Sequence, residues 1–244
     1  FYFFKSKHSE KTRSNLFAQV PNYKHPLSKI NKITDIADEF GYYQKGVKVL
    51  TNQEVRKINI KNFKVYSIST SKKEIESDYL IASADYAHVE AKLLEKKYRN
   101  YPLKYWEKKS FSPSSLLFYL GVSKKLEKLE HHTLFFDEDI EKHSDDIYEQ
   151  PIWPEKPLFY TCCPAKTESK VAPKDKENLF ILIPIAAGLK DSEKTRERYF
   201  NIVMNRLEKF CNLDIRQNIE YKKSYCINDF VQDYNAYKGN AYGL

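Results

Sequence analysis

The period of the apolar positions changes along the chain, and each period predicts a different element. Three runs alternate between apolar and polar side chains, as half-buried strands do: 47–50, 54–60 and 63–68. Lys61 and Asn62 separate the last two runs and predict a tight turn between antiparallel strands. A further run at 78–83 predicts a strand that returns to this sheet.

A helix is predicted directly after that returning strand. Asp85 is a good N-cap residue, and the apolar residues after it share one helix side: Val89, Leu93, Leu94 and Tyr98. No glycine-rich phosphate loop occurs at this step from strand to helix.

Beyond residue 101 the apolar runs become continuous. The runs have strand length and predict central strands covered on both faces: 114–122, 157–162 and 178–185. A long helix should begin at Asp191, because Glu193 lies in its first turn and apolar residues follow at helical spacing up to Phe210. Alternation at 219–230 predicts one more strand.

Together these patterns predict a mixed α/β (α+β) chain with two regions. A β-meander with its strand–helix step occupies 46–100, and a larger sheet with one long helix occupies 101–235. Residues 1–45 show no sustained period and are assigned no role.

The net positive charge of the chain is compatible with nucleic-acid binding, but the kinds and positions of its basic residues argue against it. Lys and Arg number 41 against 33 Asp and Glu, a net charge of +8. The 34 lysines far outnumber the 7 arginines and lie in scattered pairs, whereas base readers depend on arginine forks. We therefore expect no nucleic-acid partner, while attraction to an anionic membrane surface stays open.

The residues that carry metal or nucleophile chemistry form no convincing site in the sequence. His131 and His132 precede an acidic segment and His143, but neighbouring histidines on a strand should diverge, so no metal site is expected. Cys162 and Cys163 have no neighbours that would activate a thiol, and no G-x-S-x-G motif occurs. The four cysteines are expected to be reduced thiols.

Several long blocks resemble bacterial CrtI-type phytoene desaturases, which are FAD-dependent carotenoid desaturases of the amine-oxidase-like flavoprotein group. The blocks agree in order and without gaps: 128–143 (KLEHHTLFFDEDIEKH), 147–160 (IYEQPIWPEKPLFY), 163–167, 171–173, 177–180, 184–189 and 225–244. The resemblance covers about residues 46–244 and leaves 1–45 unmatched.

This resemblance implies a partial two-domain fold similar to glutathione-reductase-type FAD/NAD(P)-binding flavoproteins. Residues 46–100 would belong to the FAD-binding domain. Residues 101–235 would form a substrate domain with an antiparallel or mixed sheet, and 236–244 would begin the return to the FAD domain.

The resemblance also implies which residues lie near FAD and substrate. The Val55 backbone would bind adenine, Ser83 and Ala84 would lie against the cofactor, and Asn240 and Tyr242 would approach the isoalloxazine. Channel candidates for the long apolar substrate are Phe118, Tyr160 and Phe180. No side chain is identified as a catalytic base.

The expected activity is oxidation of phytoene toward lycopene by an enzyme that lies peripherally on the cytoplasmic face of the membrane. A hydroxycarotenoid 3,4-desaturase and a non-catalytic basic lipid- or nucleic-acid-binding protein are the alternatives. The chain begins without Met, stops at Leu244 directly after the loop-like run 239–243, and lacks both a G-x-G-x-x-G loop and a closing Gly/Pro-rich flavin motif. We therefore expect a segment of a longer protein that is inactive alone.

Overall fold

The computed structural model describes residues 3–5 and 48–243, which divide into two compact units. The first unit extends to residue 109 and includes 233–237, and the second comprises 110–232 and 238–243. The boundary after 109 lies nine residues beyond the expected 100, because α3 (Leu103–Glu107) packs its buried Trp106 against Tyr86 of the first unit. Residues 1–45, to which the sequence assigns no role, lie outside the described residues apart from 3–5.

The first unit contains two small antiparallel sheets. β1 (Phe3–Lys5) pairs with β5 (Tyr79–Ile81), and the other sheet consists of β2 (Val55–Lys61), β3 (Lys64–Thr70) and β4 (Glu74–Glu76). The predicted hairpin is confirmed, with its turn one residue later than expected. Asn62 and Phe63 both have positive φ, 50° and 57°, as the type I′ turn of a two-residue hairpin requires. Residues 48–50 do not form a strand.

Short helices follow β5. They are α2 (Tyr86–His88), the π-helix Val89–Leu93, the 3₁₀ turn Lys96–Tyr98, and α3. The predicted cap is confirmed, because an Asp85 Oδ1 accepts a hydrogen bond from the His88 N–H at 3.0 Å. Val89, Leu93 and Leu94 are buried with Ile58 and Ile68 of the β2–β3 hairpin, which joins helix and sheet in one core.

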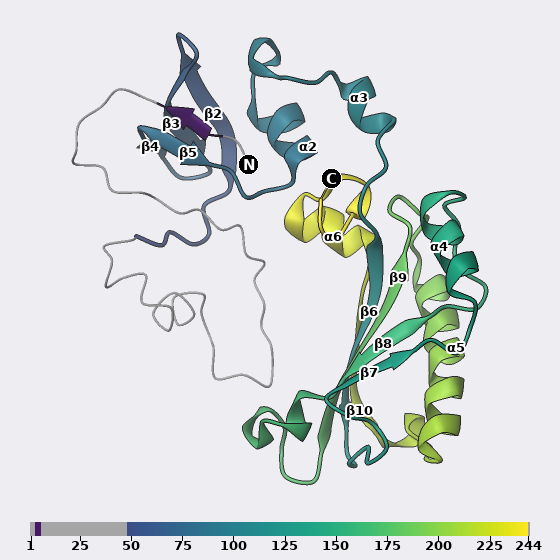
Figure 1. Ribbon diagram of the computed structural model, residues 1–244. Helices are drawn as coiled ribbons and strands as arrows, with labels where there is room; N and C mark the ends of the chain where they lie inside the picture. Colours follow the sequence, from purple (N-terminus) through teal and green to yellow (C-terminus); the bar gives the residue numbers. More distant parts are fainter. Residues whose placement is uncertain (1–2, 6–47, 244) are drawn as a thin grey trace. The chain divides into compact units, whose positions relative to one another are not determined.

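The second unit is built on a five-stranded antiparallel sheet in the order β10-β6-β9-β8-β7 (Figure 1). The strands are β6 (Ser114–Val122), β7 (His132–Phe135), β8 (Phe159–Cys162), β9 (Glu177–Ile185) and β10 (Ile219–Tyr225). The helical elements are α4 (Ile140–Tyr148), α5 (Glu193–Cys211), α6 (Ile227–Tyr234) and 3₁₀ turns at Pro164–Lys166, Ser169–Val171, Arg216–Asn218 and Tyr237–Gly239. The three predicted central strands are confirmed as interior strands.

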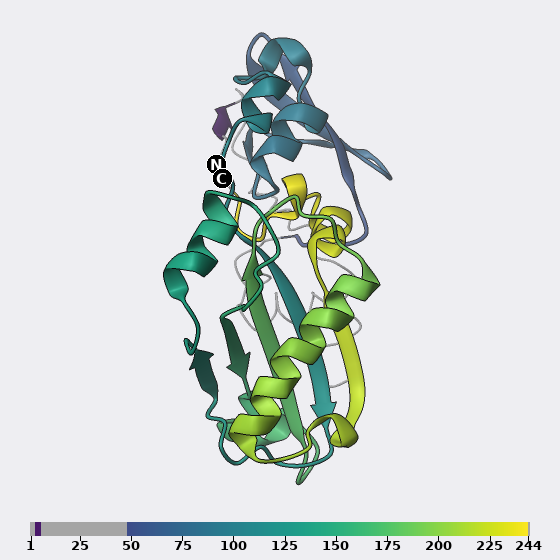
Figure 2. The same cartoon turned by 90° about the vertical axis from the view of Figure 1, so that its right-hand side faces the viewer.

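Helix α5 crosses one face of this sheet (Figure 2). Its Tyr199, Phe200 and Val203 are buried among alternate residues of β6 and β9, including Phe118 and Ile181. Ser192, rather than Asp191, caps the helix, with its Oγ accepting from the Thr195 N–H at 3.2 Å. No helix among residues 48–243 is both long and apolar enough to cross a membrane.

The opposite face of the sheet is only half-covered, which corrects the expectation of cover on both faces. Along β9 burial alternates strictly, with odd-numbered residues buried and even-numbered residues half-buried. The run at 178–185 is therefore apolar on both sides although only one side lies in the core. The apolar character of the second side needs another explanation.

An ion-pair network fastens α5 to the end of β10. Arg196 donates from Nε and Nη2 to the two carboxylate oxygens of Asp191 at 2.8 and 2.5 Å, and its Nη2 lies 2.7 Å from Asp229. Asp191 also accepts from the Asn228 N–H, and Asp229 from the Cys226 N–H. The first turn of α6 is thus held against the start of α5.

His143 is a structural residue of the core and is unavailable to a metal. Its Nδ1 accepts from the Leu158 N–H at 3.0 Å, and its Nε2 lies 2.9 Å from the Pro184 carbonyl oxygen. Both ring nitrogens are thus used by main-chain groups, which requires the neutral ring with its proton on Nε2.

We expect the second unit to lose stability as the pH falls below about 6.5, the ordinary value for histidine. Burial lowers the pKa of His143, although the Pro184 carbonyl and Asp146 act in the opposite direction. The unfolded chain then binds more protons than the folded one in this range, so the free energy of unfolding rises with pH. Denaturant unfolding between pH 5 and 8 measures the slope; His143→Gln should flatten it, and an unchanged slope in that variant would contradict the assignment.

Candidate functional site

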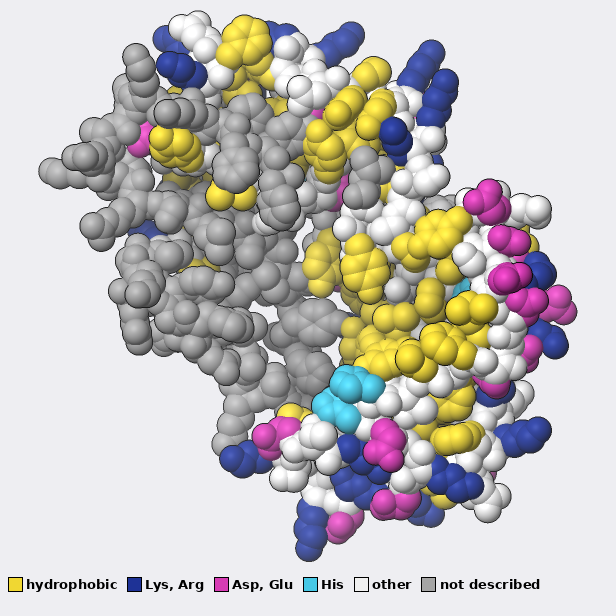
Figure 3. Space-filling view, in the orientation of Figure 1, with side chains coloured by type: hydrophobic (Ala, Val, Ile, Leu, Met, Phe, Trp, Pro, Cys, Tyr) yellow, Lys and Arg dark blue, Asp and Glu magenta, His cyan; other side chains and the backbone are white. Residues whose placement is uncertain are grey.

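The half-covered side of the five-stranded sheet carries a continuous set of apolar side chains. Cross-strand register places these residues side by side: Tyr119 of β6 opposite Phe180 of β9, Leu182 of β9 opposite Tyr160 of β8, and Tyr160 opposite Leu134 of β7. We call these five residues the apolar face. Figure 3 shows apolar side chains gathered over this sheet, with histidine side chains at their border.

The aromatic rings of the apolar face contact one another. Tyr119 and Phe180 have ring centroids 5.2 Å apart, and Tyr160 and Phe180 meet edge to face at 6.2 Å. All three side chains are half-buried, and Leu134 is 60% exposed. A long apolar ligand laid across these strands would meet a nearly unbroken hydrocarbon and aromatic surface.

Two of the three predicted channel residues share this face and the third does not. Tyr160 and Phe180 belong to the apolar face, whereas Phe118 is 1% exposed and packs edge to face on Phe200 of α5. Adjacent strand residues point to opposite sides, so Tyr119, and not Phe118, lies on the apolar face. Phe118 is a core residue, and its assignment to the channel is corrected.

A polar cluster borders the apolar face where β7 begins. The rings of His131 and His132 stack with centroids 4.1 Å apart, so the expectation that they diverge is wrong. His131 immediately precedes β7, which lets its ring turn toward that of His132. Cys162, the cross-strand partner of His132, brings its thiol within 4.8 Å of a nitrogen of each ring.

Three of the predicted cofactor residues lie in the first unit. Val55 begins β2, opposite Thr70, and Ala84 precedes the cap of α2. Val55 and Ala84 both pack against the core of this unit, and Ser83 is exposed. The structure thus places these residues at one strand start and one strand-to-helix step of the same unit.

The other two predicted cofactor residues lie in the segment 238–243 of the second unit. This segment is held by the start of β6, because the Ala241 N–H donates to the Pro113 carbonyl at 3.0 Å and the Tyr242 N–H to Ser112 Oγ at 3.1 Å. Asn240 is buried and accepts from the Gly243 N–H, whereas the Tyr242 side chain is 77% exposed. The Tyr242 ring is therefore accessible to a ligand.

Gly239 fixes the path of this segment. Its φ is +66°, and a Cβ at this position would lie 2.6 Å from the Ile227 carbonyl oxygen. We expect Gly239→Ala to lower the free energy of unfolding by about 2–4 kcal/mol through overpacking and left-handed strain. Denaturant unfolding measures the loss.

Gly243→Ala is the matched control for Gly239→Ala. Gly243 also has positive φ, +93°, but no atom lies within 4 Å of its Cβ position. Its replacement should therefore cost only about 1 kcal/mol. Equal losses in the two variants would show that the close approach to Ile227 is unimportant.

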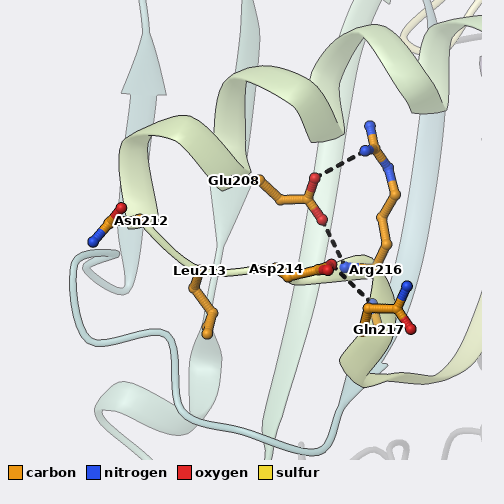
Figure 4. Close-up of a pocket in the computed structure, with 6 residues that line it drawn as sticks. All are labelled: Glu208, Asn212, Leu213, Asp214, Arg216 and Gln217. Carbon is orange, nitrogen blue, oxygen red and sulfur yellow. Dashed lines mark hydrogen bonds and ion pairs between the residues drawn. The ribbon is translucent and has the colours of Figure 1, made fainter.

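A shallow polar depression lies at the C-terminal end of α5 (Figure 4). Glu208 accepts from the Arg216 backbone N–H at 2.8 Å and from its Nη1 at 2.9 Å, and Asp214 accepts from the Gln217 N–H. Asn212 ends the helix in the left-handed conformation, with φ 50°. These contacts belong to the turn that ends α5, and they account for the depression. Its lining is polar, unlike the apolar face.

The described residues fit a flavin only in part. The ladder of β2 is irregular between Val55 and Lys57, and irregularities of this kind are frequent next to functional sites. The sequence contains six glycines and no G-x-G-x-x-G loop, the element that supplies backbone donors to a pyrophosphate. Among residues 48–243 there are therefore candidate contacts to the adenine and the ring system, but no glycine-rich loop of the kind that binds the phosphates.

Known proteins resemble the chain over most of its length. A family model described as flavin containing amine oxidoreductase matches residues 17–244, so the match extends upstream of residue 46, where the resemblance was expected to begin. The carotenoid 3,4-desaturase of Haloarcula japonica is 37% identical over 220 residues, which are 90% of this chain and 44% of that protein. The zeta-carotene-forming phytoene desaturase of Myxococcus xanthus is 29% identical over 177 residues, 70% of this chain and 33% of that protein.

A solved structure shares the fold. The crystal structure of an oxidoreductase from Methanosarcina mazei aligns with a TM-score of 0.51 and 15% identity, covering 77% of this chain and 40% of that one. The chain thus spans less than half the length of the relatives described above.

Proposed function

We propose that this chain, which belongs to the family of flavin-containing amine oxidoreductases, is part of an FAD-dependent carotenoid desaturase. The apolar face is the observation that carries the proposal. The apolar face crosses the four neighbouring strands β6, β9, β8 and β7, so at about 4.8 Å per strand it is roughly 15 Å wide, which suits a stretch of an extended isoprenoid chain laid across the strands. The identity of 37% to a carotenoid 3,4-desaturase supports the same substrate class.

A bound flavin would supply the two-electron oxidation of a carbon–carbon single bond to a double bond, and Val55, Ser83, Ala84, Asn240 and Tyr242 are the candidate residues to hold it. The residues of this chain would bind and orient the polyene and exclude water from it. Burial raises the pKa of Tyr160 to about 12, and its contact with Cys162 acts in the same direction. Tyr160 therefore stays protonated at neutral pH and serves as apolar surface and hydrogen-bond donor rather than as a base.

The preferred substrate in this proposal is phytoene, which the enzyme would desaturate towards lycopene. Desaturation at the 3,4 position of a hydroxycarotenoid is the second candidate, because the Haloarcula relative is a carotenoid 3,4-desaturase. Membranes that contain the complete gene product should be supplied with phytoene and, separately, with a hydroxylated carotenoid, and the absorption spectra of the products compared. Colour from phytoene supports the first candidate, and a red shift only with the hydroxylated substrate selects the second.

Peripheral attachment to the cytoplasmic face of the membrane is part of the same proposal. The substrate is insoluble in water, and a net charge of +8 favours an anionic surface. The protein should sediment with vesicles that contain anionic lipid and be released by salt. A salt-sensitive shift of a nucleic-acid probe would instead support the non-catalytic alternative.

A further inference from the structure

The cluster at the beginning of β7 combines three side chains that metals prefer. His131, His132 and Cys162 each offer a ligand atom, and the three atoms lie within 4.8 Å of one another. Bonds of about 2.0–2.3 Å to nitrogen and sulfur in a tetrahedral zinc site place the ligand atoms roughly 3.3–3.8 Å apart. Small side-chain rotations, of about 1 Å at the ligand atoms, would therefore close the cluster around an ion.

Hydrogen bonds to neighbouring hydroxyl groups orient both rings. His131 Nδ1 lies 2.7 Å from Thr167 Oγ1, and His132 Nδ1 lies 2.5 Å from the Tyr160 hydroxyl oxygen. When each Nδ1 carries the proton and donates, each Nε2 lone pair is left for a metal. Outer hydrogen bonds of this kind hold metal-binding histidines in one tautomer and orientation.

The backbone around the cluster is also fixed. The Cys163 N–H donates to the His131 carbonyl oxygen at 2.8 Å, and His132 and Cys162 are paired across β7 and β8. Cys162 is a free, half-buried thiol, and His132 is exposed, so solvent reaches the site. A metal ion can enter without unfolding the sheet.

We propose that His131, His132 and Cys162 bind a divalent transition metal of the zinc class. Imidazole and thiolate are ligand types that zinc prefers. The cluster contains no carboxylate, the ligand type that suits magnesium or calcium. Three protein ligands leave the fourth position to water. The site ties the edge strand β7 to β8 beside the apolar face, and it is independent of flavin and of the reaction proposed above.

Cobalt(II) is the probe, because a cobalt–thiolate bond absorbs in the near ultraviolet and tetrahedral cobalt absorbs in the visible. The untagged 244-residue chain, treated with chelator and then dialysed, is titrated with cobalt and back-titrated with zinc. We expect saturation at one cobalt per chain and loss of the bands with zinc. Cys162→Ser and His132→Asn should weaken binding by at least 100-fold.

Cys211→Ser is the matched control, since Cys211 is another half-buried free thiol, at the end of α5. It should bind cobalt as the parent chain does. Absence of saturable thiolate bands in the parent, or their survival in Cys162→Ser, would overturn the proposal.

A second measurement needs no substitution and covers the case in which a variant fails to fold. Zinc should protect Cys162 of the parent chain from iodoacetamide at least 10-fold, as followed by peptide mass mapping, and leave Cys211 unprotected. Equal alkylation of Cys162 with and without zinc would overturn the proposal.

Discussion

Under the proposed function, Phe180→Asp is expected to lower the rate of carotenoid desaturation by about 100-fold or more in the complete enzyme. Phe180 lies at the centre of the apolar face and contacts both Tyr119 and Tyr160. A carboxylate there must lose its hydration when an apolar chain is laid over it, and about 2.7 kcal/mol of that cost corresponds to a 100-fold loss. Product formation from dispersed carotenoid, at several substrate concentrations, measures the effect.

Phe210→Asp provides the matched control for Phe180→Asp. Phe210 is also partly exposed, at 44%, but it lies on α5, outside the apolar face. The same new charge there should leave the rate within about twofold of the parent. If both variants lose activity equally, or if Phe180→Asp remains active, the apolar face does not bind the substrate.

Arg196→Met is expected to lower the free energy of unfolding of the second unit by about 3–5 kcal/mol. The Arg196 side chain is 9% exposed and the Asp191 side chain is fully buried. Burial alone would raise the pKa of the Asp191 carboxyl, but hydrogen bonds from Arg196 and the Asn228 N–H hold it below its usual value. Removing the guanidinium leaves a buried carboxylate without its cation, which explains the size of the loss.

Chemical denaturation at pH 7 measures this loss, with Lys176→Met as the control. Lys176 pairs with Glu220, but the two side chains are 38% and 51% exposed. Solvent screens such a pair, so its removal should cost at most about 1 kcal/mol. A loss of this small size in Arg196→Met would contradict the role of the buried network.

The elements that the sequence predicts best are those with long apolar runs. The central strands and α5 were predictable because local patterns indicate them: continuous apolar runs for the strands and apolar residues at helical spacing for α5. α4 was not predicted, since it is short and mostly polar and is fixed by nonlocal contacts such as that between His143 and Pro184. The predicted strand at 219–230 ends at Tyr225, where Asp229 accepts from the Cys226 N–H and α6 begins instead.

The candidate site could be predicted only in part for a similar reason. The resemblance pointed to Phe118, Tyr160 and Phe180, but the register between strands decides which residues share one side of the sheet. That register places Tyr119 beside Phe180 and turns Phe118 into the core. The approach of Cys162 to the two histidines likewise depends on pairing between β7 and β8, which no local pattern encodes.

Burial alternates along β9, so neighbouring residues of this strand are under two different evolutionary constraints. Substitutions at 179, 181 and 183 change the packing under α5 and are limited by folding. Substitutions at 180 and 182 change the surface of the apolar face and leave that packing intact. If the apolar face binds the substrate as proposed, a lineage of such proteins could therefore acquire new apolar substrates through positions 180 and 182 without first accumulating stabilising mutations elsewhere.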